Sequence, residues 1–254
     1  KLLEEQLNHA KQPKVVKQSA STGIEYNVEL RKMVREIRKD INAQLVPILR
    51  ATQREYIADG YVDDITAVLQ RVAAKWSSQQ FNMLAAQLAR RFVTTADRIN
   101  RDRFGKTIRS IGIDVYIDAP EITDYLAASV YDNTQLIKSI PAQYLERVES
   151  IVMTNVRSGN RSSAIVQQLS KQFGITEKRA KMIARDQTAK INGQLVEKRQ
   201  TAVGFEYFQW MTSDDERVRD RHDELADRVT AYGKGIYRWN NPPISDSGQP
   251  ITPG

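Results

Sequence analysis

The chain has no cysteine among its 254 residues and only two histidines. The lack of cysteine excludes disulfides and thiolate metal ligands within these residues, and it fits a cytoplasmic origin. No apolar run approaches the roughly 20 residues that a membrane span needs, so we expect a soluble protein. The sequence begins with Lys1 rather than methionine and ends in a stretch rich in proline and glycine, so we expect it to be part of a longer chain.

Charge is present in mild excess, with a formal net charge of +7. Such an excess, spread along the chain, is common in proteins that have no polyanion partner. One stretch differs, because only Asp97 and Asp102 oppose its many cations. If this stretch is helical, its basic side chains can make sequence-nonspecific phosphate contacts, although a solvated face or a contact with an acidic protein is the alternative. The candidate nucleic-acid contacts are Arg90, Arg91, Arg98, Arg101, Arg103, Lys106 and Arg109.

The first half of the chain is expected to be helical. Residues 1–22 are polar and predict a short helix followed by an extended N-terminal arm. Apolar residues then recur at helical spacing through residues 23–112, which predicts a body of long amphipathic helices. Pro47 is expected to kink the first of these helices or to start a new one, and Gly112 is expected to end the last.

Residues 113–204 are expected to be a second helical region. The alternating run "IDVYID" at its start predicts a strand or an extended link. Pro141 is expected to begin a fresh helix. Gly174 predicts a turn between two further helices, with Thr176 as the N-cap of the second.

The character of the sequence changes after Gly204, which is expected to end the last long helix. "FEYFQWMTS" alternates aromatic and polar residues and predicts a strand, followed by a short charged helix and a Pro-rich loop. Residues 205–254 are therefore expected to form a small α+β module that continues beyond Gly254. The expected fold class is mainly α, with long amphipathic helices followed by this C-terminal module.

The two helices expected around Gly174 raise one function hypothesis. A helical hairpin with a central glycine and a basic second helix suits the geometry of DNA reading. Short hairpins of this kind also occur in many structural proteins. A DNA-binding adaptor is therefore kept as an alternative.

The charged segment "DDERVRDRHDEL" raises another hypothesis. His222 as a general base and Arg219 as an anion clamp would make a nuclease or transferase. The usual motifs of a nucleophile, a phosphate loop or a metal cluster are absent from the sequence, and the adjacent Asp214 and Asp215 point in different directions on any regular element. No catalytic residue, metal ligand or cofactor is predicted, and ion pairing within a structural cluster is the favoured interpretation.

An ordered series of motifs between Ile113 and Gly254 resembles the phage head-morphogenesis, or minor head protein, family, similar to the Mu protein F-like group. The series includes residues 133–152, residues 158–188 and the final loop "NNPPISDSGQPITPG". Between the last two lies a tryptophan, then Asp-x-Arg-x-Arg, then a histidine. These motif residues are Trp210, Asp215, Arg217, Arg219 and His222.

The resemblance implies a low-copy structural protein of the virion, without enzymatic activity, located at the portal vertex of a tailed phage. It implies a role in head assembly, genome packaging or DNA delivery, after assembly in the host bacterial cytoplasm and with no membrane involved. The implied partners are the portal protein, the major capsid protein or both, with nonspecific contact to packaged DNA. The family's closing Cys-Arg-Cys motif is missing here; if it follows Gly254, those cysteines and His222 converge on one structural or metal-binding cluster.

Overall fold

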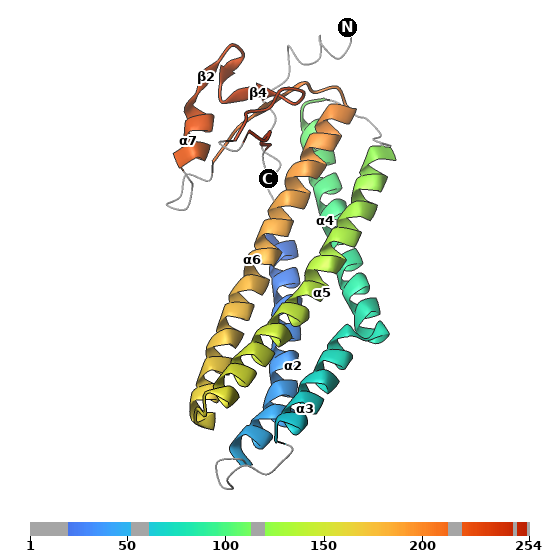
Figure 1. The fold of residues 1–254 in the computed structure, drawn as a ribbon. Coiled ribbons are helices and arrows are strands. Elements are labelled where there is room, and N and C mark those ends of the chain that lie inside the picture. Colours follow the sequence, from blue (N-terminus) through green and yellow to red (C-terminus); the bar gives the residue numbers. More distant parts are fainter. Residues whose placement is uncertain (1–19, 52–60, 113–119, 213–219, 246–247, 253–254) are drawn as a thin grey trace. The chain divides into compact units, whose positions relative to one another are not determined.

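The computed structural model describes residues 20–51, 61–112, 120–212, 220–245 and 248–252. Five long helices precede a small module of short strands and one short helix, so the expected mainly α fold with a small C-terminal module is confirmed (Figure 1). The elements in order are α2 (Ala20–Ala51), α3 (Tyr61–Ser77), α4 (Gln79–Ser110), α5 (Pro120–Arg157), α6 (Ser162–Ala202), β1 (Tyr207–Gln209), α7 (Asp220–Asp227), β2 (Val229–Thr230), β3 (Gly233–Lys234) and β4 (Ile236–Arg238).

The described chain forms two compact units. The first unit comprises residues 20–95 and 127–188, and the second comprises residues 96–126 and 189–254. Helices α4, α5 and α6 each contribute residues to both units. The domain boundaries expected after residues 22, 112 and 204 stay predictions. None of the described helices combines the length and the hydropathy required to cross a membrane.

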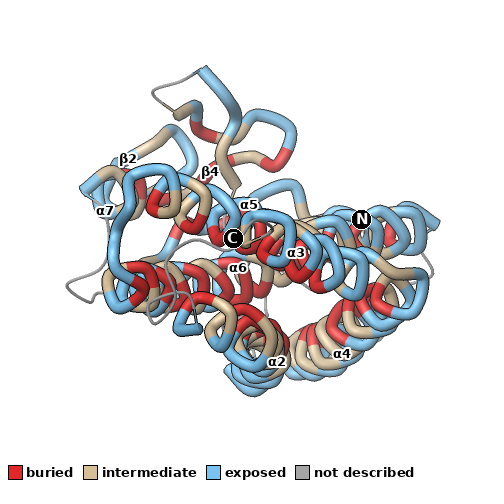
Figure 2. The backbone as a smooth tube through the Cα atoms, turned by 60° about the horizontal axis from the view of Figure 1, so that its bottom comes forward, coloured by how far each residue is buried: buried red, intermediate tan, exposed pale blue. Residues whose placement is uncertain are grey.

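The core of the first unit is built from the apolar faces of its helices. Buried positions recur every three or four residues along the long helices (Figure 2), as amphipathic helices require. Tyr26 on α2 is 2% exposed and stacks on Phe92 of α4 with ring centroids 3.9 Å apart. Its hydroxyl donates to Asn133 Oδ1 on α5 at 3.1 Å. The polar end of this tyrosine is thus satisfied inside the core.

Two prolines lie inside helices that continue through them, so the expectation that Pro47 or Pro141 begins a new helix is wrong. An internal proline costs a helix roughly 3 kcal/mol. Here buried residues lie within one turn of each proline, Leu45 and Leu49 around Pro47 and Ile140 beside Pro141. Their burial offsets that cost, because a break at the proline would remove them from the core.

α6 is a single helix through Gly174, so the expected turn and the hairpin built on it are wrong. Thr176 is not an N-cap, since it is buried and its Oγ1 donates to the carbonyl of Gln172 at 3.0 Å. The physical reason is the buried face of α6, which continues past Gly174 from Phe173 through Thr176 to Ala180. Without this hairpin, the helix-turn-helix hypothesis is wrong.

The predicted helix ends at glycine are confirmed. α4 ends at Ser110 just before Gly112, and α6 ends at Ala202 just before Gly204. Both glycines have positive φ, 82° and 88°, the left-handed conformation that favours glycine after a helix. The start of α2 differs from expectation, because residues 20–22 belong to the helix rather than to the N-terminal arm, with Thr22 buried. The rest of the arm (residues 1–19) and "IDVYID" (residues 113–118) lie outside the described residues.

The C-terminal module lies in the second unit and contains two antiparallel strand pairs. β1 pairs with β4, with Phe208 opposite Tyr237, and β2 pairs with β3. The strand expected in "FEYFQWMTS" is confirmed, although it is only three residues long. α7 begins at Asp220, within the segment that was expected to form a charged helix.

Candidate functional site

The C-terminal module has an aromatic core of its own. Phe208, Trp210, Leu225, Tyr237 and Trp239 are all buried and form one cluster. The rings of Phe208 and Trp239 lie 4.1 Å apart, and the Tyr237 hydroxyl donates to the carbonyl of Leu225 at 2.8 Å. Aromatic pairs of this kind contribute roughly 0.5–1.5 kcal/mol each beyond burial of their area. The cluster therefore holds β1, α7 and β4 together.

Two of the five motif residues lie in the described part of this module. The Trp210 ring lies 5.3 Å from the His222 ring of α7, and the Trp210 backbone amide donates to the carbonyl of Gly235 at 2.7 Å. The structure thus brings together the tryptophan and the histidine, 12 residues apart in sequence. Their structural role stays a prediction. Asp215, Arg217 and Arg219 lie outside the described residues.

Gly235 sits where the module's backbone segments approach most closely. Its φ of +67° is in the left-handed region, and a Cβ at this position would lie 2.7 Å from the carbonyl oxygen of Ala226. Its own amide donates to the carbonyl of Arg228 at 2.8 Å. Only glycine fits this backbone without displacement.

One side of the module presents aromatic rings to solvent. Tyr207 and Tyr232 are 42% and 48% exposed, with ring centroids 4.9 Å apart. The Arg238 guanidinium lies 5.3 Å from the Tyr207 ring centroid and pairs with Glu206 at 2.6 Å. Tyrosine and arginine are enriched among the residues that contribute most to protein–protein binding. Tyr207, Tyr232 and Arg238 are together called the Tyr207 patch below.

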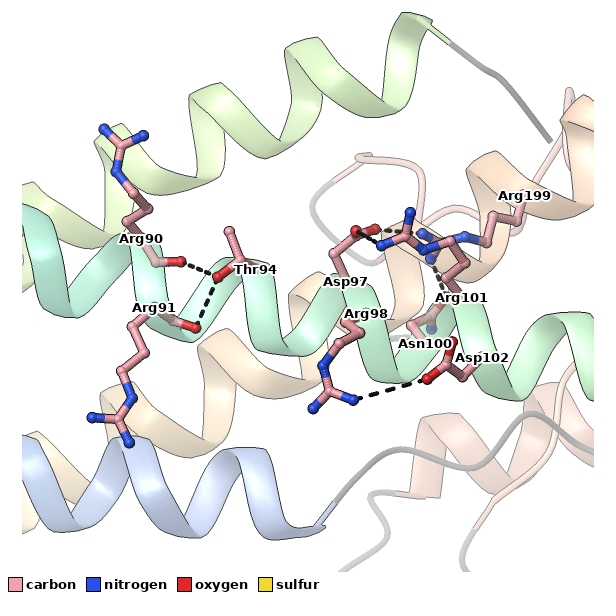
Figure 3. A network of polar contacts seen from close by, with 9 residues as sticks. All are labelled: Arg90, Arg91, Thr94, Asp97, Arg98, Asn100, Arg101, Asp102 and Arg199. Carbon is pink, nitrogen blue, oxygen red and sulfur yellow. Dashed lines mark hydrogen bonds and ion pairs between the residues drawn. The ribbon is translucent and has the colours of Figure 1, made fainter.

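The seven basic candidates for nucleic-acid contact all lie on α4, and all but Arg103 are exposed. Figure 3 shows Arg90, Arg91, Arg98 and Arg101. Three of them make long ion pairs: Arg91 with Glu25 at 3.8 Å, Arg98 with Asp102 at 3.9 Å, and Arg101 with Asp97 at 3.4 Å. Exposed pairs of this kind are worth at most about 1 kcal/mol. A phosphate can therefore replace these carboxylates at little cost, but contact with nucleic acid stays a prediction.

Beneath the exposed arginines, α4 and α6 share a buried polar network in the second unit (Figure 3). The Arg199 guanidinium, 3% exposed, donates to Asp97 and to the side-chain oxygen of Asn100. Asn100 in turn donates to Asn192 Oδ1 at 2.8 Å. Burial lowers the pKa of Arg199, while the hydrogen bond and the charge of Asp97 raise it. The carboxylate thus compensates a buried cation, which is costly when unpaired.

Sequence reasoning missed this network, although a signal for it was present. Asn100 lies four residues before the buried Phe104, and Arg199 lies four residues after the buried Leu195. Each therefore occupies a position on the apolar face of its helix. A polar residue at such a position indicates a buried partner, because an unpaired polar group is rarely buried.

Among the residues that the structure describes, no group of three or more histidine and acidic side chains could hold a metal ion. That the chain holds no metal or cofactor stays a prediction.

Residues 146–251 match the family described as "Phage Mu protein F like protein". This part of the chain is similar to that family. The matched region contains all of α6 and the aromatic module with Trp210 and His222, so the resemblance expected from the motif series is confirmed.

A relative matches the chain over a longer stretch. An uncharacterized protein of Haemophilus influenzae is 31% identical over 238 residues, which cover 91% of this chain and 52% of the relative. The chain thus spans about half the length of that relative. No solved structure matches the chain.

Proposed function

We propose that the protein is a minor head protein of a tailed phage that binds at the portal vertex. Its role there is in head assembly, genome packaging or DNA delivery, and its partners are the portal protein, the major capsid protein or both. The proposal rests on one observation, the match of residues 146–251 to the Phage Mu F-like family. It assigns no catalytic role to His222 and requires no cofactor.

Two features of the described residues support binding to a protein surface. The Tyr207 patch combines exposed tyrosine rings with an arginine in the region matched by the family. The aromatic core beneath it holds the patch on a folded module rather than on a loose loop, which lowers the entropy lost on binding.

The test is co-purification of the full-length protein with the portal oligomer of the phage that encodes it. The complex is washed over a salt series with and without nuclease. We expect a complex that survives both treatments. Recovery only with DNA, and its loss after nuclease treatment, would contradict the proposal.

A matched pair of variants locates the contact. Tyr207→Ser combined with Tyr232→Ser should weaken the complex by roughly tenfold or more, since exposed aromatic anchors often contribute over 1 kcal/mol each. The control is Tyr131→Ser, which removes a tyrosine that is 66% exposed on α5. Equal weakening by the control would show that the Tyr207 patch is not the contact.

Contact with packaged DNA through α4 is a second proposed activity, and the exposure of the basic side chains favours it. Arg98→Gln combined with Arg109→Gln removes two exposed cations from one face of the helix. The slope of log K against log salt for a DNA duplex should become shallower by about 2, because each phosphate contact contributes about 0.9. An unchanged slope would exclude this face. The control is Lys32→Gln with Lys39→Gln on α2, which should leave the slope unchanged.

A further inference from the structure

A cavity of about 300 Å³ lies in the first unit among α2, α5 and α6. Its polar lining consists of Arg38, Asn42 and Arg50 from α2, Tyr144 from α5 and Ser170 from α6. The remaining lining residues are apolar, and no carboxylate is among them. The cavity therefore has two positive charges on its wall and no acidic group to balance them.

The two arginines are available to a ligand. Among the described residues, no carboxylate lies within ion-pair distance of Arg38 or Arg50. The Arg38 guanidinium lies 4.2 Å from the centroid of the buried Phe173 ring. Stacking of this kind fixes the guanidinium plane and leaves its N–H groups at the edge free to donate.

Tyr144 supplies a hydroxyl group to the cavity wall. Its residue is 2% exposed and lines the cavity. Burial raises the pKa of Tyr144 to about 12, against the lowering effect of Arg38, so the hydroxyl keeps its proton at neutral pH. A protonated hydroxyl can donate a hydrogen bond to a ligand in the cavity that Tyr144 lines.

We propose that this cavity binds a phosphate group. Arginine presents several N–H groups in a fixed plane, which suits the oxygens of a phosphate, and two arginines match the charge of a dianion. The Tyr144 hydroxyl donates to a further oxygen, and Ser170 and Asn42 add polar groups at the rim. The phosphate comes either from a small phosphate compound or from the backbone of a nucleic acid. None of the residues that line this cavity belongs to the Tyr207 patch, so the phosphate site can be tested independently of the portal proposal.

Isothermal titration calorimetry of the full-length protein with inorganic phosphate, at constant ionic strength, tests the site. We expect saturable binding to one site. Arg38→Gln and Arg50→Gln should each weaken it by about tenfold or more, because each removes a charge-assisted hydrogen bond. Lys32→Gln is the matched control, since Lys32 is an exposed cation on the same helix that does not line the cavity.

Tyr144→Phe separates loss of binding from loss of folding. The variant keeps the buried ring and removes only the hydroxyl group. We expect phosphate binding to weaken several-fold while the midpoint of thermal unfolding stays the same or rises. A fall in the midpoint with unchanged binding would contradict the role given to this hydroxyl.

A short DNA duplex distinguishes the two sources of phosphate. Competition between duplex and inorganic phosphate, weakened by Arg38→Gln, would assign the site to nucleic acid. Binding of inorganic phosphate without such competition would assign it to a small phosphate compound. Absence of saturable binding at fixed ionic strength, or equal weakening by Lys32→Gln and Arg38→Gln, would overturn the proposal.

Discussion

Arg199 joins α4 and α6 in the second unit through its buried guanidinium. The side chain lies on α6 and is 3% exposed, and its partners Asp97 and Asn100 lie on α4. A buried cation without its carboxylate is destabilising by several kcal/mol, whereas an exposed ion pair contributes little. Asp97 therefore differs from the other acidic residue of the basic stretch, Asp102, although the sequence shows them as equivalent.

This difference predicts the effect of removing each carboxylate. Asp97→Ala should lower the free energy of unfolding by about 3 kcal/mol, because it leaves Arg199 buried and unpaired. Asp102→Ala should change it by less than about 0.5 kcal/mol, since Asp102 is 58% exposed and 3.9 Å from Arg98. Denaturant unfolding of both variants measures the difference. Equal losses would contradict the buried ion pair.

Glu197 is expected to make stability depend on pH. Burial raises its pKa above the ordinary value of 4.5, against a smaller lowering effect of Lys198. The folded protein therefore holds this proton more tightly than the unfolded chain, and stability falls as pH rises through the window above 4.5. Glu197→Gln should raise the thermal midpoint at pH 7, and this gain should disappear as the pH falls below about 4.5. A gain that persists at low pH would have another cause.

At the scale of elements, helix ends were predictable and helix continuity was not. Gly112 and Gly204 were found because a glycine after a helix adopts positive φ, which is a local property. The new helix expected at Pro141 and the turn expected at Gly174 were wrong, because the local preference of each residue is outweighed by the burial of the flanking turns. That burial depends on neighbouring helices, which one sequence does not reveal.

The continuity of α6 predicts the sign of one substitution. Gly174 lies inside the helix, and a Cβ at this position has no atom within 4 Å. Gly174→Ala should therefore stabilise the protein by about 0.5–1 kcal/mol, because alanine is the better helix former. A turn at Gly174 would make the same change destabilising. Denaturant unfolding of the variant distinguishes the two structures.

Gly235 in the C-terminal module and Gly159 between α5 and α6 have similar φ angles. Comparing them separates the effect of close backbone approach at Gly235 from the effect of the left-handed conformation. Gly159 has a φ of +64° and no neighbour within 4 Å, so Gly159→Ala should lose only about 1–2 kcal/mol for the left-handed conformation. Gly235→Ala should lose more, because its Cβ would meet the carbonyl of Ala226 at 2.7 Å. In Gly235→Ala, the near-ultraviolet circular dichroism of Trp210 and Trp239 should change as well, because both lie in the core of this module. An equal loss for the two variants would contradict the close approach at Gly235.

At the scale of the whole molecule, the fold class and the family were predictable, while the buried sites were not. The helical periodicity and the ordered motifs around Trp210 and His222 are visible in one sequence, and both were confirmed. The Arg199 network and the cavity beside Tyr144 combine residues from different helices. Their identification requires knowledge of which helix faces meet, and that follows only from tertiary packing.

The central claim is that the protein is a component of the phage head, and quantitative mass spectrometry of purified particles tests it most directly. Heads and complete virions of the phage that encodes the protein are compared with the portal protein as an internal standard. We expect the protein in purified heads in a low number of copies, comparable to that of the portal. Its absence from both heads and virions, when the portal is detected, would contradict the claim.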